Sequence, residues 1–206
     1  MYLLKTINQI KNMLKVGAFF GSTQYEMDNF FCGIGESKIL ENVIKINDYP
    51  FKPSQVYPSK EINASEIAEI YLNNYPPTIK IGDELIFISR EYVDELEKFA
   101  DGNNIKKADC NSNWNTICDP FVDTEFDDEY KKRSIQNLKE KGFTEKGIAD
   151  LREEIGEQMY KYNFDTMLWD WCGLGLKDVL SAMRVKLSEQ DFEEFYWRAM
   201  EIEQRN

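Results

Sequence analysis

The spacing of apolar residues changes along the chain, and this change is the strongest limit on the fold. Before residue 90, β-branched and aromatic residues alternate with polar ones and are interrupted by glycine and proline, which is the pattern of short strands. After residue 124, apolar residues recur every three or four positions, the period of an amphipathic helix. Strands that precede helices, instead of alternating with them, predict an α+β fold. We expect antiparallel strands mainly in residues 18–90 and helices over about 124–204.

Local signals place elements in the first half. The apolar positions of residues 1–16 share one stripe of a helix. Two or three strands are expected over 18–48, a proline-containing loop over 49–62 and a hairpin over 78–89. Asn63 and Glu66 have the spacing of a capping box, which predicts a helix from there to the prolines that follow residue 75.

In the second half the signals are those of helix ends. Ser89 is expected to cap a helix that ends near Gly102, and residues 103–123 are expected to form a long loop. Thr124 and Thr144 are each expected to begin a helix, the first ending at a Schellman stop around Gly142. Two more helices are expected over 176–187 and from 188 onward. We predict one α+β domain over 1–206, with a subdivision near 103–123 as the alternative.

Composition excludes several function classes. The 206 residues are 42% hydrophobic, enough to bury a core, and they contain no histidine. Catalysis by Ser-His-Asp or Cys-His groups and zinc bound by histidine are therefore excluded. The formal net charge is -12, whereas nucleic acids and anionic membranes attract a surplus of lysine and arginine. We expect no direct binding to nucleic acid and none to membranes.

The compartment follows from the same residues. No apolar run approaches the roughly 18 residues that a membrane-spanning helix needs. Residues 1–16 alternate apolar and polar side chains, unlike a secretory signal. We therefore expect a cytoplasmic protein. Its four cysteines form no Cys-x-x-Cys pair. Cys110 and Cys118 are expected to stay reduced; in an oxidising compartment they are close enough in sequence to form a disulfide.

The first 50 residues contain equal numbers of acids and bases. The excess of negative charge lies in the rest of the chain, where two acidic clusters stand out. Each cluster lies at the expected start of a helix, where carboxylates are stabilised by the helix dipole. Aromatic residues flank both, and an acidic rim around an aromatic anchor suits a protein–protein hot spot. The predicted partner-binding residues are Asp123, Glu125, Asp127, Asp128, Glu129, Glu189, Asp191, Glu193, Glu194, Trp169, Trp171 and Trp197.

Three short motifs have some features of ligand sites but lack others that such sites need. Gly33 and Gly35 lack the spacing and lysine of a phosphate-binding loop. Asp109, Asn111 and Asn113 have the spacing of a calcium loop that then lacks its glycine and glutamate. The acids of 119–129 could hold magnesium only with a carboxylate from elsewhere, such as residue 165 or 170. We expect no catalytic residue, no metal site and no cofactor.

The sequence favours a non-enzymatic acidic protein that binds and inhibits a basic partner protein, such as a toxin or nuclease domain. In size, acidity and lack of a catalytic constellation it resembles bacterial toxin-immunity (antitoxin) proteins. Two alternatives stay open. One is a metal-dependent carboxylate hydrolase or phosphoryl-transfer enzyme, since Asp, Glu, Lys, Tyr and Cys can also serve as acids or bases. The other is an acidic DNA mimic, which would share the same charge argument.

Overall fold

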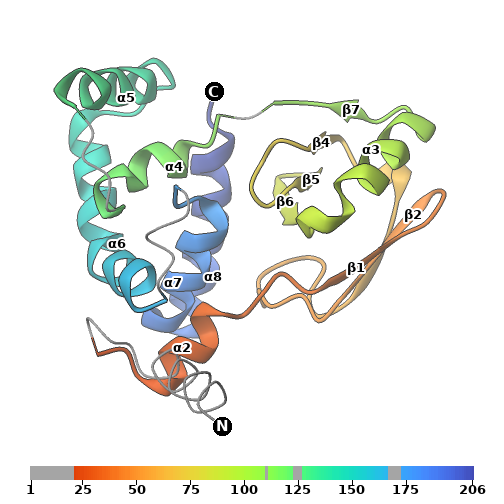
Figure 1. Cartoon of the computed structure of the whole chain (residues 1–206), viewed down its shortest axis with the longest axis horizontal. Helices are drawn as coiled ribbons and strands as arrows, with labels where there is room; N and C mark the ends of the chain where they lie inside the picture. The colour runs from red at the N-terminus through yellow and green to blue at the C-terminus, as the bar shows by residue number, and fades with distance from the viewer. Residues whose placement is uncertain (1–20, 110, 123–126, 167–172) are drawn as a thin grey trace, which may run out of the picture. The chain divides into compact units, whose positions relative to one another are not determined.

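A computed structural model describes residues 21–109, 111–122, 127–166 and 173–206 (Figure 1). The chain forms two compact units. We call residues 33–112 and 191–201 the sheet unit, and residues 1–32, 113–190 and 202–206 the helical unit. Strands lie in the first half of the chain and long helices in the second, which confirms the predicted α+β fold. The chain passes from the sheet unit to the helical unit after Ser112, within residues 103–123, the segment of the alternative subdivision.

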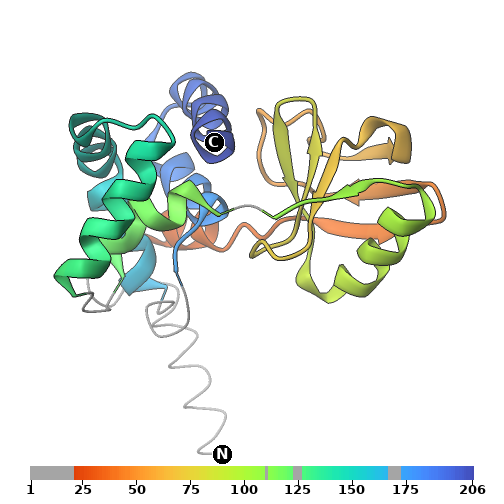
Figure 2. The ribbon, with the colours of Figure 1, turned by 90° about the horizontal axis from the view of Figure 1, so that it is seen from above.

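The sheet unit contains two small sheets, visible from above in Figure 2. The first has the order β1-β2-β3 and is antiparallel; its strands are Glu36–Ile39, Val43–Asn47 and Lys60–Asn63. The second has the order β6-β5-β4-β7, with β7 parallel to β4 and the other neighbours antiparallel. Its strands are β4 Glu69–Tyr71, β5 Thr78–Ile81, β6 Glu84–Phe87 and β7 Lys106–Lys107.

Alternation of side chains builds the core of the sheet unit. Ile44 and Ile46 of β2 are buried, while the residues between and beside them are more exposed, as the two-residue period of a strand requires. The predicted hairpin is confirmed: β5 and β6 pair antiparallel around Gly82, which adopts a φ of 57°. After a short 3₁₀ turn over Arg90–Tyr92, helix α3 (Val93–Gly102) buries Leu96 and Phe99.

The helical unit gathers the remaining helices. The last helix, α8 (Glu189–Gln204), contributes its first two residues and its end to this unit, and its middle to the sheet unit. The other elements are α2 Gln24–Phe30, α4 Asn113–Cys118, η3 Asp119–Phe121, α5 Asp128–Glu140, α6 Glu145–Asp165 and α7 Leu176–Lys186.

Helix ends in this unit follow the predicted chemistry. The hydroxyl of Thr144 accepts a hydrogen bond from Gly147 N at 3.0 Å, so α6 begins where expected. At the end of α5, Phe143 N donates to Leu138 O at 3.1 Å beside Gly142, whose φ is 83°. This is the predicted Schellman stop. Helices α7 and α8 also confirm the sequence pattern. The expected helix over 1–16 and the cap at residue 124 lie outside the described residues.

One predicted strand region contains a helix. Residues 24–30 form α2, within the 18–48 segment for which two or three strands are predicted; the described strands begin only at Glu36. The reason is a capping box, in which the Thr23 hydroxyl accepts from Glu26 N while Thr23 N donates to Glu26 Oε2 at 2.6 Å. These two bonds satisfy donors at the helix start, and Met27 and Phe30 are buried on one side.

The prediction of a helix from Asn63 is also wrong. The capping box forms, with Asn63 N donating to Glu66 Oε2 at 2.8 Å, but it starts only the 3₁₀ turn Ala64–Glu66. Backbone at Ile67 is extended, and the chain then forms β4, which pairs on both edges. A strand in the middle of a sheet gains backbone partners on two sides, and this outweighs a local helix start.

The loop expected over 103–123 is in part regular structure. Its described residues contain β7, α4 and η3, with short irregular stretches between and beside them. Trp114 of α4 is fully buried, so this short helix is fixed by core packing. Six residues are too few to show a helical period, because that period needs a longer window.

Gly35, in the turn before β1, provides a first stability test. Its φ is 78°, and a Cβ there would lie 2.5 Å from the carbonyl oxygen of Asn47. Gly33 has a φ of 71° with open space around it. We expect Gly33→Ala to lower the free energy of unfolding by about 1 kcal/mol, because of backbone strain alone. Gly35→Ala adds the clash to that strain and should lower it by about 2 kcal/mol. Urea unfolding of the two variants measures the difference; equal losses would contradict the predicted clash.

Candidate partner-binding surface on helix α8

The exposed side of α8 in the sheet unit carries a tryptophan among carboxylates. Trp197 exposes 39% of its surface, an unusual fraction for so large an apolar side chain. Glu193 and Glu201 lie four residues before and after it, and Glu194 lies three residues before it. Residues three and four apart are neighbours on a helix surface, and all three glutamates are exposed. The three carboxylates therefore lie on the same face of the helix as the indole.

The opposite side of the same helix segment is buried. Phe192, Phe195 and Tyr196 are each at most 7% exposed. Phe51, from the loop that precedes β3, lies 6.5 Å from the Phe192 ring and 6.1 Å from the Tyr196 ring, between centroids. Apolar residues at these spacings give the segment one buried face, and that face fixes which residues point outward.

The charge of this surface is predominantly negative. Residues 191–201 carry four carboxylates, of Asp191, Glu193, Glu194 and Glu201, and one guanidinium, of Arg198. That guanidinium lies 5.3 Å from the centroid of the Phe195 ring. Fields from exposed carboxylates act over about a Debye length of 8–10 Å at physiological salt. The surface can therefore attract a cationic side chain and offer it an aromatic ring.

The structure brings some of the predicted binding residues together. Asp191, Glu193, Glu194 and Trp197 lie exposed on one helix segment of the sheet unit, and Glu189 is the exposed first residue of that helix, in the helical unit. The predicted residues Asp123, Glu125, Trp169 and Trp171 lie outside the described residues.

The predicted residues on α5 have a local role. Asp127 is the N-cap, and its Oδ1 accepts from Tyr130 N at 2.6 Å. Asp128 and Glu129 follow in the first turn and are exposed. Carboxylates there face the positive end of the helix dipole. These acids belong to the helical unit and stabilise the start of α5; their predicted part in partner binding stays a prediction.

The sequence analysis did not predict two residues of the surface, nor the buried contact beneath it. Glu201 and Arg198 were not predicted, although their spacing from Trp197 along a helix could have indicated them. The contact between Glu84 and Tyr196, which lie beneath the surface, gave no signal. Their contact joins residues that are 112 positions apart, and no local pattern reveals a contact at that separation.

A separate acid, Asp119, is held in a polar cluster of the helical unit. The carboxyl oxygen Oδ2 is buried and has no hydrogen-bond partner among the described residues. Burial raises the pKa of Asp119 to about 6, against the lowering effects of Ser134, Arg152 and Tyr130. The neighbouring Cys118 is a free thiol whose pKa is raised, chiefly by burial.

This cluster predicts a pH dependence of stability. The folded pKa of Asp119, about 6, exceeds its ordinary value of 3.8, so the folded state holds the proton more tightly. Its contribution to stability is full below pH 3.8 and is lost as the pH rises through about 6. Asp119→Asn cannot ionise. We expect the Tm of Asp119→Asn to match that of wild type near pH 3.8 and to exceed it above about pH 6. Circular dichroism measures both, with the exposed Glu153→Gln of α6 as control. A constant difference at all pH values would contradict this.

The other sites considered in the sequence have structural roles. Asp165 Oδ2 accepts a hydrogen bond from Ser22 N at 3.0 Å, and the Asn113 amide binds backbone at the end of α8. Within the described ranges, no three His, Cys, Asp or Glu residues are grouped closely enough to hold a metal ion. None of the described helices is both long and apolar enough to span a membrane.

Comparison with known proteins gives no relative for this chain. No protein-family model matches it, and neither a curated protein nor a solved structure shows significant similarity.

Proposed function

We propose that this chain is a non-enzymatic, cytoplasmic binding protein that inhibits a basic partner protein, as bacterial toxin-immunity proteins do. The observation that carries the proposal is the exposed Trp197 among three carboxylates on α8. Tryptophan is among the residues most enriched at binding hot spots, and a net charge of -12 favours a cationic partner. Binding would cover the functional surface of the partner and block access to it.

The proposed mechanism has two stages. The acidic field first increases the rate of encounter with a basic surface, an effect that added salt weakens. Trp197 then inserts between side chains of the partner and slows dissociation. The carboxylates therefore act mainly on the association rate and the indole mainly on the dissociation rate.

The test begins by capturing the partner on the immobilised full chain, from cells in which its gene is native. Association and dissociation rates of the captured protein are then measured at low and at physiological salt. We expect Glu193→Gln/Glu194→Gln to slow association about tenfold at low salt, with a smaller effect at physiological salt.

The matched control is Glu91→Gln/Glu95→Gln. These two glutamates are also exposed and belong to the same unit, so the control makes the same change in net charge. The proposal is contradicted if both pairs slow association equally, if salt has no effect, or if no protein is captured at low salt. Competition by duplex DNA, with a captured protein that itself binds DNA, would instead support the DNA-mimic alternative.

A further inference from the structure

Beneath the α8 surface, the sheet unit buries a complete carboxyl group. Glu84, the first residue of β6, is 0% exposed. Glutamate is rarely fully buried unless its oxygens have partners. Here Oε1 accepts from the Tyr196 hydroxyl at 2.5 Å, and Oε2 accepts from Gln55 N at 3.1 Å. Both oxygens are therefore held, one of them by α8.

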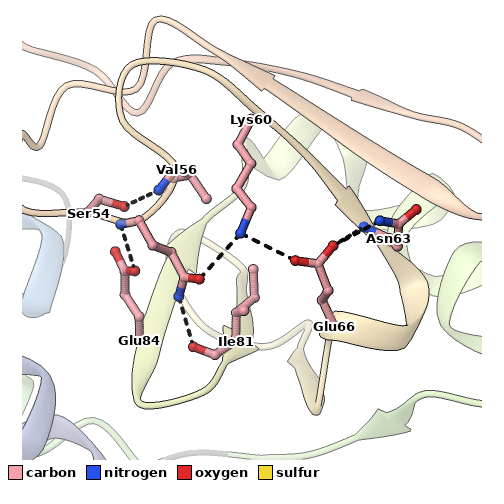
Figure 3. A network of polar contacts seen from close by, with 8 residues as sticks. Ser54, Val56, Lys60, Asn63, Glu66, Ile81 and Glu84 are labelled. Atoms are coloured by element: carbon pink, nitrogen blue, oxygen red, sulfur yellow. Dashed lines mark hydrogen bonds and ion pairs between the residues drawn. The ribbon is translucent and has the colours of Figure 1, made fainter.

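The loop that contacts Glu84, which includes residues 54–56, is fixed by a network of polar contacts (Figure 3). Gln55 Nε2 donates to Ile81 O at 3.1 Å, and Val56 N donates to Ser54 Oγ at 3.2 Å. Lys60 then joins Gln55 to Glu66, with its ammonium 3.3 Å from a Glu66 carboxylate oxygen. Glu84 is held against this loop and is thus a fixed acceptor for the helix.

Tyr196 transmits this position to the exposed indole. Its side chain is fully buried, and its ring meets the Trp197 ring edge-on, with centroids 5.4 Å apart and planes at 88°. Burial, followed by the nearby Tyr49 and Glu84, raises the pKa of Tyr196 well above its ordinary value. The hydroxyl therefore keeps its proton and remains a hydrogen-bond donor. A fixed hydroxyl fixes the ring, and the ring limits the orientations open to Trp197.

We infer that Glu84 and Tyr196 are a positioning pair that orients Trp197 for partner binding. Neither side chain is exposed, so the pair acts through the indole and does not touch the partner. This inference rests on the proposed function, because it assigns the role of the buried pair in that same surface. Holding the indole in its bound orientation reduces the entropy that binding must remove, which slows dissociation.

The orientation itself is tested on the full chain labelled with 5-fluorotryptophan. Its four tryptophans give separate fluorine NMR signals, and Trp197→Phe assigns the one of interest. We expect Tyr196→Phe to move the Trp197 signal and leave the Trp114 signal in place. Glu84→Gln keeps the shape of the side chain but cannot accept at both oxygens, so it should move the same signal. Tyr57→Phe, an exposed tyrosine of the same unit, is the control. A Trp197 signal unmoved in both variants overturns the inference.

The second readout is the dissociation rate of the captured partner. We expect Tyr196→Phe to raise this rate about threefold to tenfold, but to have no effect in a Trp197→Ala background. The same increase in both backgrounds would show a role other than positioning Trp197 and would overturn the inference. If Trp197→Ala itself left the rate unchanged, the proposed function would have failed, whatever the NMR signal showed.

Discussion

Replacing Asn113 with alanine is expected to lower the free energy of unfolding by about 3 kcal/mol. The Asn113 side chain is buried at the start of α4. Its amide nitrogen donates to the carbonyls of Ile202, Glu203 and Arg205, at 2.8, 3.3 and 2.8 Å, at the end of α8. The last carbonyls of a helix lack the backbone N–H partners that earlier ones have, so alanine removes side-chain hydrogen bonds that they accept in a largely buried position.

The same residue also holds a cation. Asn113 Oδ1 accepts from Lys141 Nζ at 2.8 Å, and alanine removes this bond as well. Thermal unfolding should show a decrease in Tm of roughly 6–12 °C. Asn137→Ala makes the same chemical change at an exposed site of α5 and should change stability by less than about 0.5 kcal/mol. Similar values for the two variants would contradict the role of Asn113 as a helix cap.

Trp197→Ala is expected to weaken binding of the captured partner by about 3 kcal/mol, roughly a hundredfold in Kd. The change should lie mainly in the dissociation rate, because truncation removes contacts made after encounter and leaves the charge unchanged. Surface plasmon resonance on the full chain measures both rates.

An exposed aromatic residue elsewhere in the sheet unit gives the matched control. Tyr75 is 71% exposed, and the Arg90 guanidinium lies 5.7 Å from its ring centroid. Tyr75→Ala removes a similar apolar area and should leave both rates within about twofold of wild type. If Tyr75→Ala weakened binding as much as Trp197→Ala, the binding surface would not be centred on α8.

Helices were predictable where the local pattern and the caps agreed. Thr144 and Gly142 marked the boundary between α5 and α6, and both bonds form as expected. The errors arose where long-range pairing decided the structure. The cap at Asn63 was read correctly, but β4 follows it because this strand pairs with both β5 and β7. The partner strands lie outside any local window, so the sequence pattern could not show them.

The candidate surface was predictable only in part. The acids and Trp197 were visible as an aromatic residue within an acidic run, and helical periodicity separates the exposed side of α8 from the buried one. The burial of Glu84 was not predictable, because a glutamate after a Gly-Asp turn resembles an exposed hairpin residue. Its partners come from a loop and from a helix more than a hundred residues later.

Hydroxyl-radical footprinting of the complex tests most directly whether α8 is the binding surface. The oxidation rate of each aromatic side chain is measured by mass spectrometry, with and without the captured partner. The account predicts that oxidation of Trp197 falls to the level of the buried Trp114, while oxidation of Tyr75 is unchanged. Undiminished oxidation of Trp197 in the saturated complex, with protection of side chains elsewhere, would contradict it.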